Sequence, residues 1–233
     1  MDAVTNANLS GNLMPGIDVR SASIVVRNEE GVSYADDGSE SSIKSGTEIT
    51  DAIIAAWKKS ELISIEDSHV KDDKLSLRDL KEKITQYMNE VKGNKDSTQM
   101  SYALSGIGRE SGCFVQIIAD SACTSAEELT AGLEEAIFNS IKVRLRSYRT
   151  VSRAISMCKA ARSAGWAVII GADEDYSETI DTFLSDFAVG VGASQIVLGT
   201  LDSSEGCSKM NRLLEIYQES DSISFVGRSF RSV

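Results

Sequence analysis

The segment Gly165–Leu214 reads GWAVIIGADEDYSETIDTFLSDFAVGVGASQIVLGTLDSSEGCSKMNRLL and decides the fold class. Its two apolar runs, Ala167–Ile170 and Ser194–Leu198, are short and contain β-branched residues, as expected of strands buried on both faces. The stretch Glu178–Val189 between them and the stretch Ser204–Gln218 after them have helical patterns. This order of strand, helix, strand and helix predicts an α/β fold with parallel strands.

The same alternation extends through the rest of the chain. Four further apolar runs are predicted strands: Met14–Val19, Leu62–Ile65, Phe114–Ala119 and Ile141–Leu145. Four further stretches with helical spacing are predicted helices: Ser45–Lys59, Leu75–Val91, Thr124–Phe138 and Thr150–Ser163. Two of these helices are expected to begin at a capping box, Ser45/Glu48 and Thr124/Glu127.

Composition and charge limit the classes of partner. The chain has 233 residues, of which 42% are hydrophobic, and 24 basic against 35 acidic residues give a net charge of −11. Such an acidic chain is not expected to bind nucleic acid or an anionic membrane surface. No apolar run approaches the roughly 20 residues of a membrane helix, and no secretory signal is recognised, so we expect a cytoplasmic protein. The scattered cysteines are expected to be reduced: Cys113, Cys123, Cys158 and Cys207.

Two polar stretches interrupt the alternation of strands and helices. Residues 28–45 and 93–112 are polar and contain glycine, and both are interpreted as polar insertions, the second as a long loop or insertion. Ser23–Arg27 is a further strand candidate, which could form an inserted hairpin with Gly31–Ala35. Neither stretch has the periodicity of a separate domain, so one domain over residues 1–233 is expected.

Candidate functional residues lie where the predicted strands end, because active groups of α/β sheets and barrels come from the carboxyl ends of strands. Asp18, Glu66 and Asp120 follow three of the strands, and three such carboxylates could bind one hard cation. Acidic residues after strands are also common helix caps and turn formers, so spacing alone leaves both interpretations open. The single histidine, His69, has no identifiable nucleophile or acid partner and is interpreted as a loop residue.

Several motifs together resemble those of the enolase family. In its C-terminal barrel a GW strand is followed by GETEDTF, GQIKTG and KYNQLL, which are similar to Ser177–Phe183, Ser194–Gly199 and Lys209–Leu214. Upstream, the family's SIEDPF, IVADD and GLD motifs are similar to Ser64–Asp67, Ile117–Asp120 and Gly16–Asp18. These similarities cover most of the chain in the same order.

The resemblance implies an enolase-type (β/α) TIM barrel and the magnesium-dependent lyase reaction of glycolysis, which converts 2-phosphoglycerate to phosphoenolpyruvate. The family's three magnesium carboxylates fall on Asp18, Glu66 and Asp120, all still acidic. Its proton-abstracting lysine falls on Arg144 and its second active-site lysine on Val197. A guanidinium has a pKa above about 12 and is not a neutral base near pH 7. Val197 carries no charge, so enolase activity is not expected.

Other parts of the family's site and assembly are also changed. The SHRS substrate loop corresponds to Gly171–Tyr176, where Asp173, Glu174 and Asp175 would repel a phosphorylated substrate. An arginine of the family's dimer interface falls on Glu215, so the resemblance does not support an enolase-type homodimer. Because the matched region begins near the third barrel strand, about six of eight strands are expected, without the N-terminal cap domain. A partner could complete the barrel, or the sheet could be open, or the chain could be a fragment.

These observations lead to one main interpretation and two alternatives. The main one is a catalytically inactive enolase-like protein that acts as a structural or scaffold module in a larger assembly with other proteins. The resemblance includes divergent enolases of sperm and cilia, which points to an axonemal setting. The alternatives are a magnesium-dependent lyase with a substituted base, and a magnesium-binding sensor that uses Asp18, Glu66 and Asp120 without chemistry.

Overall fold

The structure is a computed structural model of the chain. It describes residues 16–28, 31–35, 43–60, 62–93, 115–172, 180–199, 202–227 and 230. The chain divides into two compact units, Met1–Ala122 and Cys123–Val233. Of the expected 93–112 insertion, only Gly93 belongs to the described residues, and the expectation of one domain over residues 1–233 stays a prediction.

The first unit contains three parallel strands in the order β1 (Gly16–Asp18), β5 (Ser64–Glu66) and β6 (Gln116–Ala119). All four residues of β6 are buried, as the continuous apolar pattern predicts for a strand covered on both faces. Each of these strands is shorter than the apolar run that predicts it. At β5, for example, Leu62 is buried but precedes the paired residues, so burial extends beyond the strand pairing.

An antiparallel sheet lies between β1 and β5 in sequence. It consists of β2 (Val25–Asn28), β3 (Gly31–Ala35) and β4 (Ile43–Ser45), which confirms the predicted hairpin. Within the predicted polar insertion near residues 28–45, β3 and β4 take part in backbone pairing. The short helix α2 (Ser21–Ile24) takes the first residues of the predicted strand.

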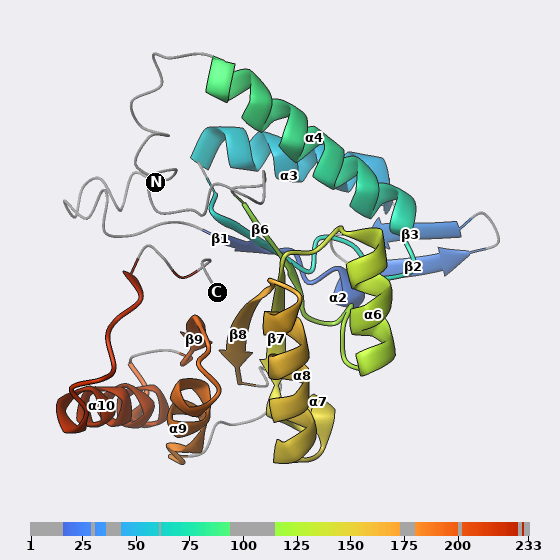
Figure 1. Cartoon of the computed structure of the whole chain (residues 1–233). Coiled ribbons are helices and arrows are strands. Elements are labelled where there is room, and N and C mark those ends of the chain that lie inside the picture. The colour runs from blue at the N-terminus through green and yellow to red at the C-terminus, as the bar shows by residue number, and fades with distance from the viewer. Residues whose placement is uncertain are drawn as a thin grey trace. The chain divides into compact units, whose positions relative to one another are not determined.

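Two long helices complete the first unit and pack side by side (Figure 1). Helix α3 (Gly46–Ser60) begins at the predicted capping box, in which Ser45 Oγ accepts from Glu48 N at 3.3 Å and Glu48 accepts from Ser45 N at 2.7 Å. Helix α4 (Lys74–Gly93) buries a row of residues at helical spacing. The buried residues are Ile49, Ile53, Ile54 and Trp57 on α3, and Leu77, Leu80, Ile84 and Met88 on α4.

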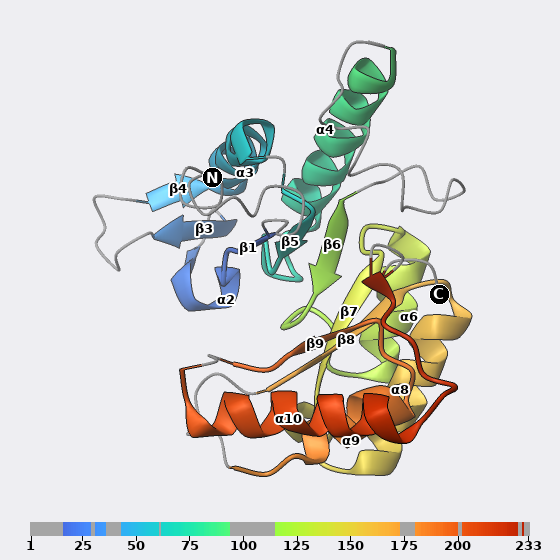
Figure 2. The ribbon, with the colours of Figure 1, turned by 90° about the vertical axis from the view of Figure 1, so that its left-hand side faces the viewer.

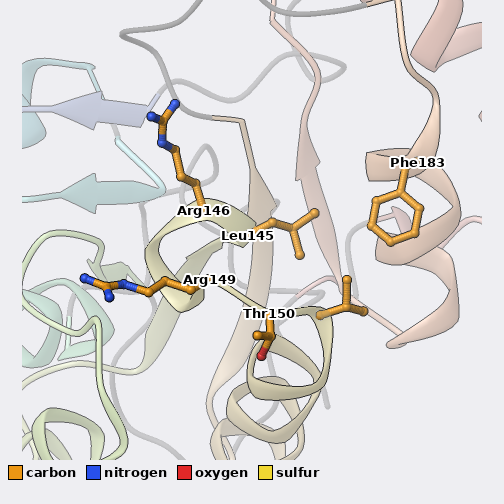
Figure 3. Close-up of a pocket in the computed structure, with 6 residues that line it drawn as sticks. Leu145, Arg146, Arg149, Thr150 and Phe183 are labelled. Atoms are coloured by element: carbon orange, nitrogen blue, oxygen red, sulfur yellow. The ribbon is translucent and has the colours of Figure 1, made fainter.

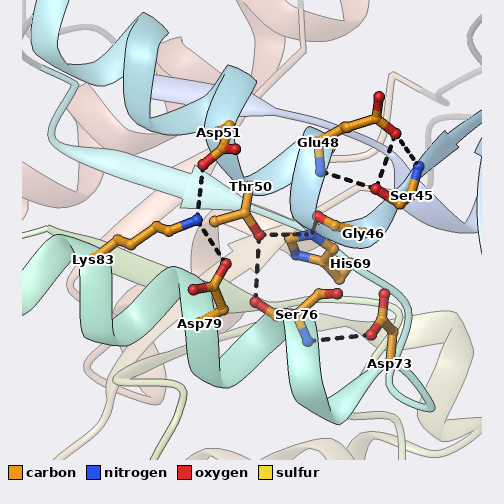
Figure 4. Close-up of polar contacts among 10 residues, drawn as sticks. All are labelled: Ser45, Gly46, Glu48, Thr50, Asp51, His69, Asp73, Ser76, Asp79 and Lys83. Carbon is orange, nitrogen blue, oxygen red and sulfur yellow. Dashed lines mark hydrogen bonds and ion pairs between the residues drawn. The ribbon is translucent and has the colours of Figure 1, made fainter.

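A polar cluster joins the hairpin to the starts of both helices, and Figure 4 shows its part around His69, Gly46, Asp73 and Ser76. The Tyr34 hydroxyl on β3 donates to Asp73 Oδ2 at 2.9 Å, and Asp73 Oδ1 accepts from Ser76 N at 3.2 Å at the start of α4. The buried His69 donates from Nε2 to the Gly46 carbonyl oxygen at 3.0 Å. Because every partner here is polar and at least partly buried, loss of one would leave others unsatisfied.

The second unit contains three further parallel strands in the order β7 (Ser140–Arg144), β8 (Ala167–Gly171) and β9 (Gln195–Val197). Its helices are α6 (Ala126–Glu135), α7 (Leu145–Tyr148), α8 (Val151–Ser163), α9 (Phe183–Gly190) and α10 (Ser204–Glu219). Helices α9 and α10 lie side by side (Figure 2). The two units together hold six parallel strands among the described residues, which confirms the α/β prediction.

Two local predictions in the second unit need correction, and one short helix was missed. The N-cap of α6 is Ser125 and not Thr124, whose backbone N and hydroxyl instead donate to Glu128. Helix α9 begins at Phe183, whose N–H donates to Asp181 at 2.7 Å. Helix α7 was not predicted from the sequence, and a hydrogen bond from the buried Tyr148 hydroxyl to the Cys123 carbonyl oxygen at 3.1 Å anchors it.

None of the described helices combines the length and the apolar character needed to cross a membrane.

A substitution at Gly46 tests how closely the polar cluster is packed. A Cβ atom at this position would overlap Ser76 Oγ and Asp73 Oδ2 and lie 2.8 Å from Ser76 Cβ. We expect Gly46→Ala to lower the free energy of unfolding by about 1–3 kcal/mol, measured by chemical denaturation. Gly190→Ala is the matched control, since a Cβ there meets nothing within 4 Å. Equal effects of the two substitutions would contradict the close packing at Gly46.

Candidate functional site

The three carboxylates predicted as magnesium ligands lie at one end of the first unit's strands. Asp18 and Glu66 are register partners on β1 and β5, and Glu66 is paired in turn with Ile118 on β6. Asp120 lies two residues after Ile118, immediately after the end of β6. The backbone therefore carries all three acids to the carboxyl ends of neighbouring parallel strands, as the sequence predicts.

The side chains nevertheless do not form a ready metal site. Both carboxylate oxygens of Asp18 are bound by Arg20, whose backbone N lies 3.0 Å from Oδ1 and whose Nε lies 3.3 Å from Oδ2. Within the described residues, no three or more histidine, cysteine or acidic side chains are placed so that they could hold a metal ion. These residues, as placed, do not fit a magnesium ion, and the assignment of Asp18, Glu66 and Asp120 stays a prediction.

Asp67 has a structural part in this region that the sequence does not reveal. It has a left-handed φ of 45°, and its Oδ1 accepts from Ser121 N at 3.0 Å and from Asp120 N at 3.3 Å. Burial and the nearby charge of Asp120 raise the pKa of this carboxyl group. Asp67 therefore fastens the end of β5 to the turn that carries Asp120.

A second row of residues lies at the strand ends of the other unit. Arg144, Gly171 and Val197 are successive register partners on β7, β8 and β9. The positions that the resemblance assigns to two lysines and to the substrate loop are thus neighbours in space. Arg144 carries a permanent positive charge, and Val197 is an exposed apolar side chain. Asp173, Glu174 and Asp175, expected next to this row, lie outside the described residues.

Lys142 is a residue that the sequence analysis missed. It is only 3% exposed and lies on β7 two residues before Arg144, so the alternation of a strand places both on one face. The Lys142 side chain packs across Gly171 on the neighbouring strand. A Cβ atom added at residue 171 would lie 3.3 Å from Lys142 Cγ. A lysine inside the apolar run Ile141–Leu145 was the signal that could have identified it.

The remaining candidate groups lie outside these two rows. Burial lowers the pKa of His69, with an opposing effect from its bond to Gly46, so this histidine is a neutral packing group in the polar cluster. Cys123 and Cys158 are buried, which raises the pKa of Cys123 to about 12 and of Cys158 to about 11. Such thiols are unreactive near neutral pH. Cys113 lies outside the described residues, and Cys207 is exposed.

Comparison with known proteins agrees with this arrangement. Residues 94–233, more than half of the chain, match the family described as Enolase, C-terminal TIM barrel domain. The chain belongs to the enolase family. Its six parallel strands with intervening helices are those of a partial enolase-type barrel.

Individual enolases are similar over a shorter region. Enolase of Malacoplasma penetrans (strain HF-2) is 34% identical over 112 residues, which are 48% of this chain and 24% of that enolase. Enolase of Desulfotalea psychrophila is 36% identical over 106 residues, 45% of this chain and 25% of that protein. Enolase 1 of Methylococcus capsulatus is 37% identical over 108 residues, 46% of this chain and 25% of that protein. The chain thus spans about a quarter of the length of the curated relatives it matches.

Arg20 allows a direct test of the cation site. Removal of its side chain in Arg20→Ala leaves Asp18 Oδ2 without its guanidinium partner and available to a divalent cation. We expect magnesium to raise the melting temperature of Arg20→Ala more than that of the native chain. Magnesium at ten times its Kd would stabilise the variant by about 1.4 kcal/mol.

The matched control is Arg20→Ala combined with Asp120→Asn, which should lose the magnesium response. Thermal unfolding with increasing magnesium chloride measures all three proteins. An equal response of the native chain and Arg20→Ala would show that Arg20 does not compete with a cation at Asp18.

Proposed function

We propose that this enolase-family domain is catalytically inactive and acts as a structural module in a larger protein assembly. The observation that carries the proposal is the row Arg144, Gly171 and Val197 across β7, β8 and β9. The residues that match the family's reactive lysines, Arg144 and Val197, lie on either side of Gly171 in this row, and neither of them can remove a proton. The domain therefore keeps the fold of the family without the group that performs its first chemical step.

The chemistry of the family's reaction makes the loss of the base severe. Removal of a carbon-bound proton needs a neutral base near pH 7, and a guanidinium stays protonated there. Loss of a general base typically costs a factor of about 10²–10⁴ in rate. Val197 supplies no positive charge for the developing enolate, which removes a further stabilising interaction.

Magnesium has no assigned role in this proposal. The enolase family uses magnesium bound by carboxylates, but here Arg20 binds both oxygens of Asp18. The proposed inactivity therefore rests on the absent base, and a cation at Asp18, Glu66 and Asp120 would not restore it.

The structural part of the proposal is supported by how much of the packing is intact. Strands β6 and β8 are buried along their whole length, and α8 and α10 keep serine or threonine N-caps. The family's homodimer is not supported, since Glu215 is paired with Arg212 of its own helix at 3.0 Å. A cytoplasmic assembly such as that of a cilium or axoneme is part of the proposal, and only the resemblance to divergent enolases supports this setting.

A second candidate function follows from Lys142. Its side chain starts from the same face of β7 as that of Arg144, so Lys142 could act as a substituted base in an enolase-type lyase. Its burial argues against this role, because a base must reach the substrate. The two functions differ in one measurable property, the turnover of 2-phosphoglycerate.

The test is turnover of 2-phosphoglycerate with magnesium, followed by the ultraviolet absorbance of phosphoenolpyruvate. We expect the native chain to match Asp120→Ala and Lys142→Met at the background rate, with circular dichroism as the control for folding. Turnover by the native chain that both substitutions abolish would establish the lyase and overturn the proposed inactivity. Turnover retained by Lys142→Met alone would overturn it through another base.

A further inference from the structure

Two features of the structure lie apart from the strand ends of the candidate site. One is a hollow of about 570 Å³ at the start of α8, where the guanidinium groups of Arg146 and Arg149 extend away from the exposed Phe183 (Figure 3). The described part of the chain does not show what covers this hollow. The other is the polar cluster of the first unit, which encloses His69, the single histidine of the sequence (Figure 4).

The imidazole ring of His69 is held from two sides. His69 lies between β5 and α4 in sequence and is only 1% exposed. On the side of α3, the Gly46 carbonyl oxygen accepts from Nε2 at 3.0 Å, and Thr50 Oγ1 lies 3.3 Å from the same nitrogen. On the side of β3, the Tyr34 ring contacts the imidazole edge to face, with 5.6 Å between the ring centroids. Because a carbonyl oxygen only accepts hydrogen bonds, the proton of the neutral ring is on Nε2.

The other ring nitrogen of His69, Nδ1, is buried and has no hydrogen-bond partner in the part of the chain that the structure describes. In the neutral ring this nitrogen is an acceptor that lacks a donor, whereas in the protonated ring it is a charged donor that lacks an acceptor. A buried charge without a partner costs more free energy than a buried neutral group without one. The surroundings of His69 therefore fit the neutral ring and not the protonated one.

Asp73, whose charge acts on His69 from the start of α4, already has partners of its own. Its Oδ2 accepts from the Tyr34 hydroxyl at 2.9 Å, and its Oδ1 accepts from Ser76 N at 3.2 Å. Burial and the charge of Asp73 raise the pKa of Tyr34, so this hydroxyl keeps its proton and continues to donate. Both oxygens of Asp73 are thus bound before His69 takes a proton.

Other charged groups around His69 do not supply an acceptor either. The carboxylates of its own connection and of the first two turns of α3 and α4 are bound elsewhere: Asp67 by Ser121, Asp72 by Arg27, Asp51 and Asp79 by Lys83, and Glu48 by Ser45. The first two turns of α4 also contain three basic residues, which only donate: Lys74, Arg78 and Lys81. A proton on Nδ1 would therefore add positive charge where the negative charges are already paired.

We propose that His69 is a pH-sensitive switch of the first unit, whose neutral ring holds the starts of α3 and α4 together and whose protonation at Nδ1 releases them. A charged ring would move from its enclosed position into water and lose its bond to the Gly46 carbonyl oxygen. The release would reach α4, because Gly46 is packed closely against Ser76 and Asp73. The switch uses none of the residues at the strand ends, so it does not depend on the proposed function.

Acid should therefore weaken the first unit. Burial lowers the pKa of His69 in the folded chain, and its bond to Gly46 and the charges of Asp73 and Asp79 oppose this lowering without cancelling it. In the unfolded chain the ring has the ordinary pKa of about 6.5. As the pH falls through this value, the unfolded state binds a proton that the folded state excludes, so the free energy of unfolding decreases. The decrease ends once the pH is below the folded-state pKa.

The single histidine permits a direct measurement of the switch. In the full chain without a histidine tag, ¹⁵N-labelled histidine gives nitrogen NMR signals from His69 alone. We expect the signals of the neutral ring to persist in the folded chain between about pH 7.5 and 5.5, a range in which an exposed histidine takes up its proton. The protonated form should appear only together with the signals of unfolded chain. Titration of His69 in the folded chain with a midpoint near 6.5 would overturn the proposal.

A substitution separates the switch from a general loss of stability. In His69→Gln the amide can still donate to the Gly46 carbonyl oxygen, and it does not titrate. Between about pH 7.5 and 5.5, the unfolding constant of the native chain should rise about five- to tenfold more than that of His69→Gln, measured by urea denaturation at each pH. Ile84→Val is the matched control, since it shortens a buried side chain of α4 without changing a titratable group, and it should keep the native pH dependence.

Hydrogen exchange locates the response in the first unit. After correction for the intrinsic effect of pH, amides of β3 and of the starts of α3 and α4 should exchange faster at about pH 5.5 than at 7.5 in the native chain, and not in His69→Gln. Equal pH dependence of the native chain and His69→Gln, or its loss in Ile84→Val as well, would overturn the proposal. If His69→Gln does not fold, the NMR titration of the native chain decides the question alone.

Discussion

The backbone pairing of Arg144 with Gly171 and Val197, and of Asp18 with Glu66, determines where the functional side chains of this chain lie. The six parallel strands are only three to five residues long, so each contributes few side chains to its carboxyl end. Parallel pairing places these ends together within each unit. The fold thus keeps the position of the family's site even where the residues at that position have changed.

At the strand ends of each unit an arginine supports the proposed inactivity. Arg20 binds Asp18, at a carboxylate that the family uses for magnesium, and Arg144 lies where the family has its lysine base. At Asp18 the guanidinium of Arg20 supplies positive charge, which limits the electrostatic cost of placing this acid near others. A guanidinium neither polarises a substrate oxygen as a bound metal does nor accepts a proton. The proposed loss of the chemical step therefore does not require a loss of stability.

The fold was predictable where the sequence signal is local. Continuous apolar runs located β6, β7 and β8, and the Ser45/Glu48 box located the start of α3, since burial and capping depend on neighbouring residues. Helix α7 and the strand pairing of β4 were not predicted. They depend on contacts with distant segments, such as the bond from Tyr148 to Cys123. A sequence pattern does not report such contacts.

The candidate site was likewise predictable only in part. Motifs located Asp18, Glu66, Asp120, Arg144 and Val197, and the strand register places them as neighbours within their units. The contact between Arg20 and Asp18 was not predictable, because it requires the left-handed φ of 52° at Arg20. The burial of Lys142 was missed for a related reason, since its side chain packs across Gly171 on the neighbouring strand, a contact that a sequence pattern does not report.

In the proposed function, no group among the residues that the structure describes removes the carbon-bound proton of 2-phosphoglycerate. Proton NMR of 2-phosphoglycerate in heavy water, with magnesium and the native chain, tests this step without requiring product to form. We predict that the signal of the C2 proton persists as it does in buffer alone. Loss of that signal through exchange with deuterium, absent with Lys142→Met, would contradict the account and identify Lys142 as a working base.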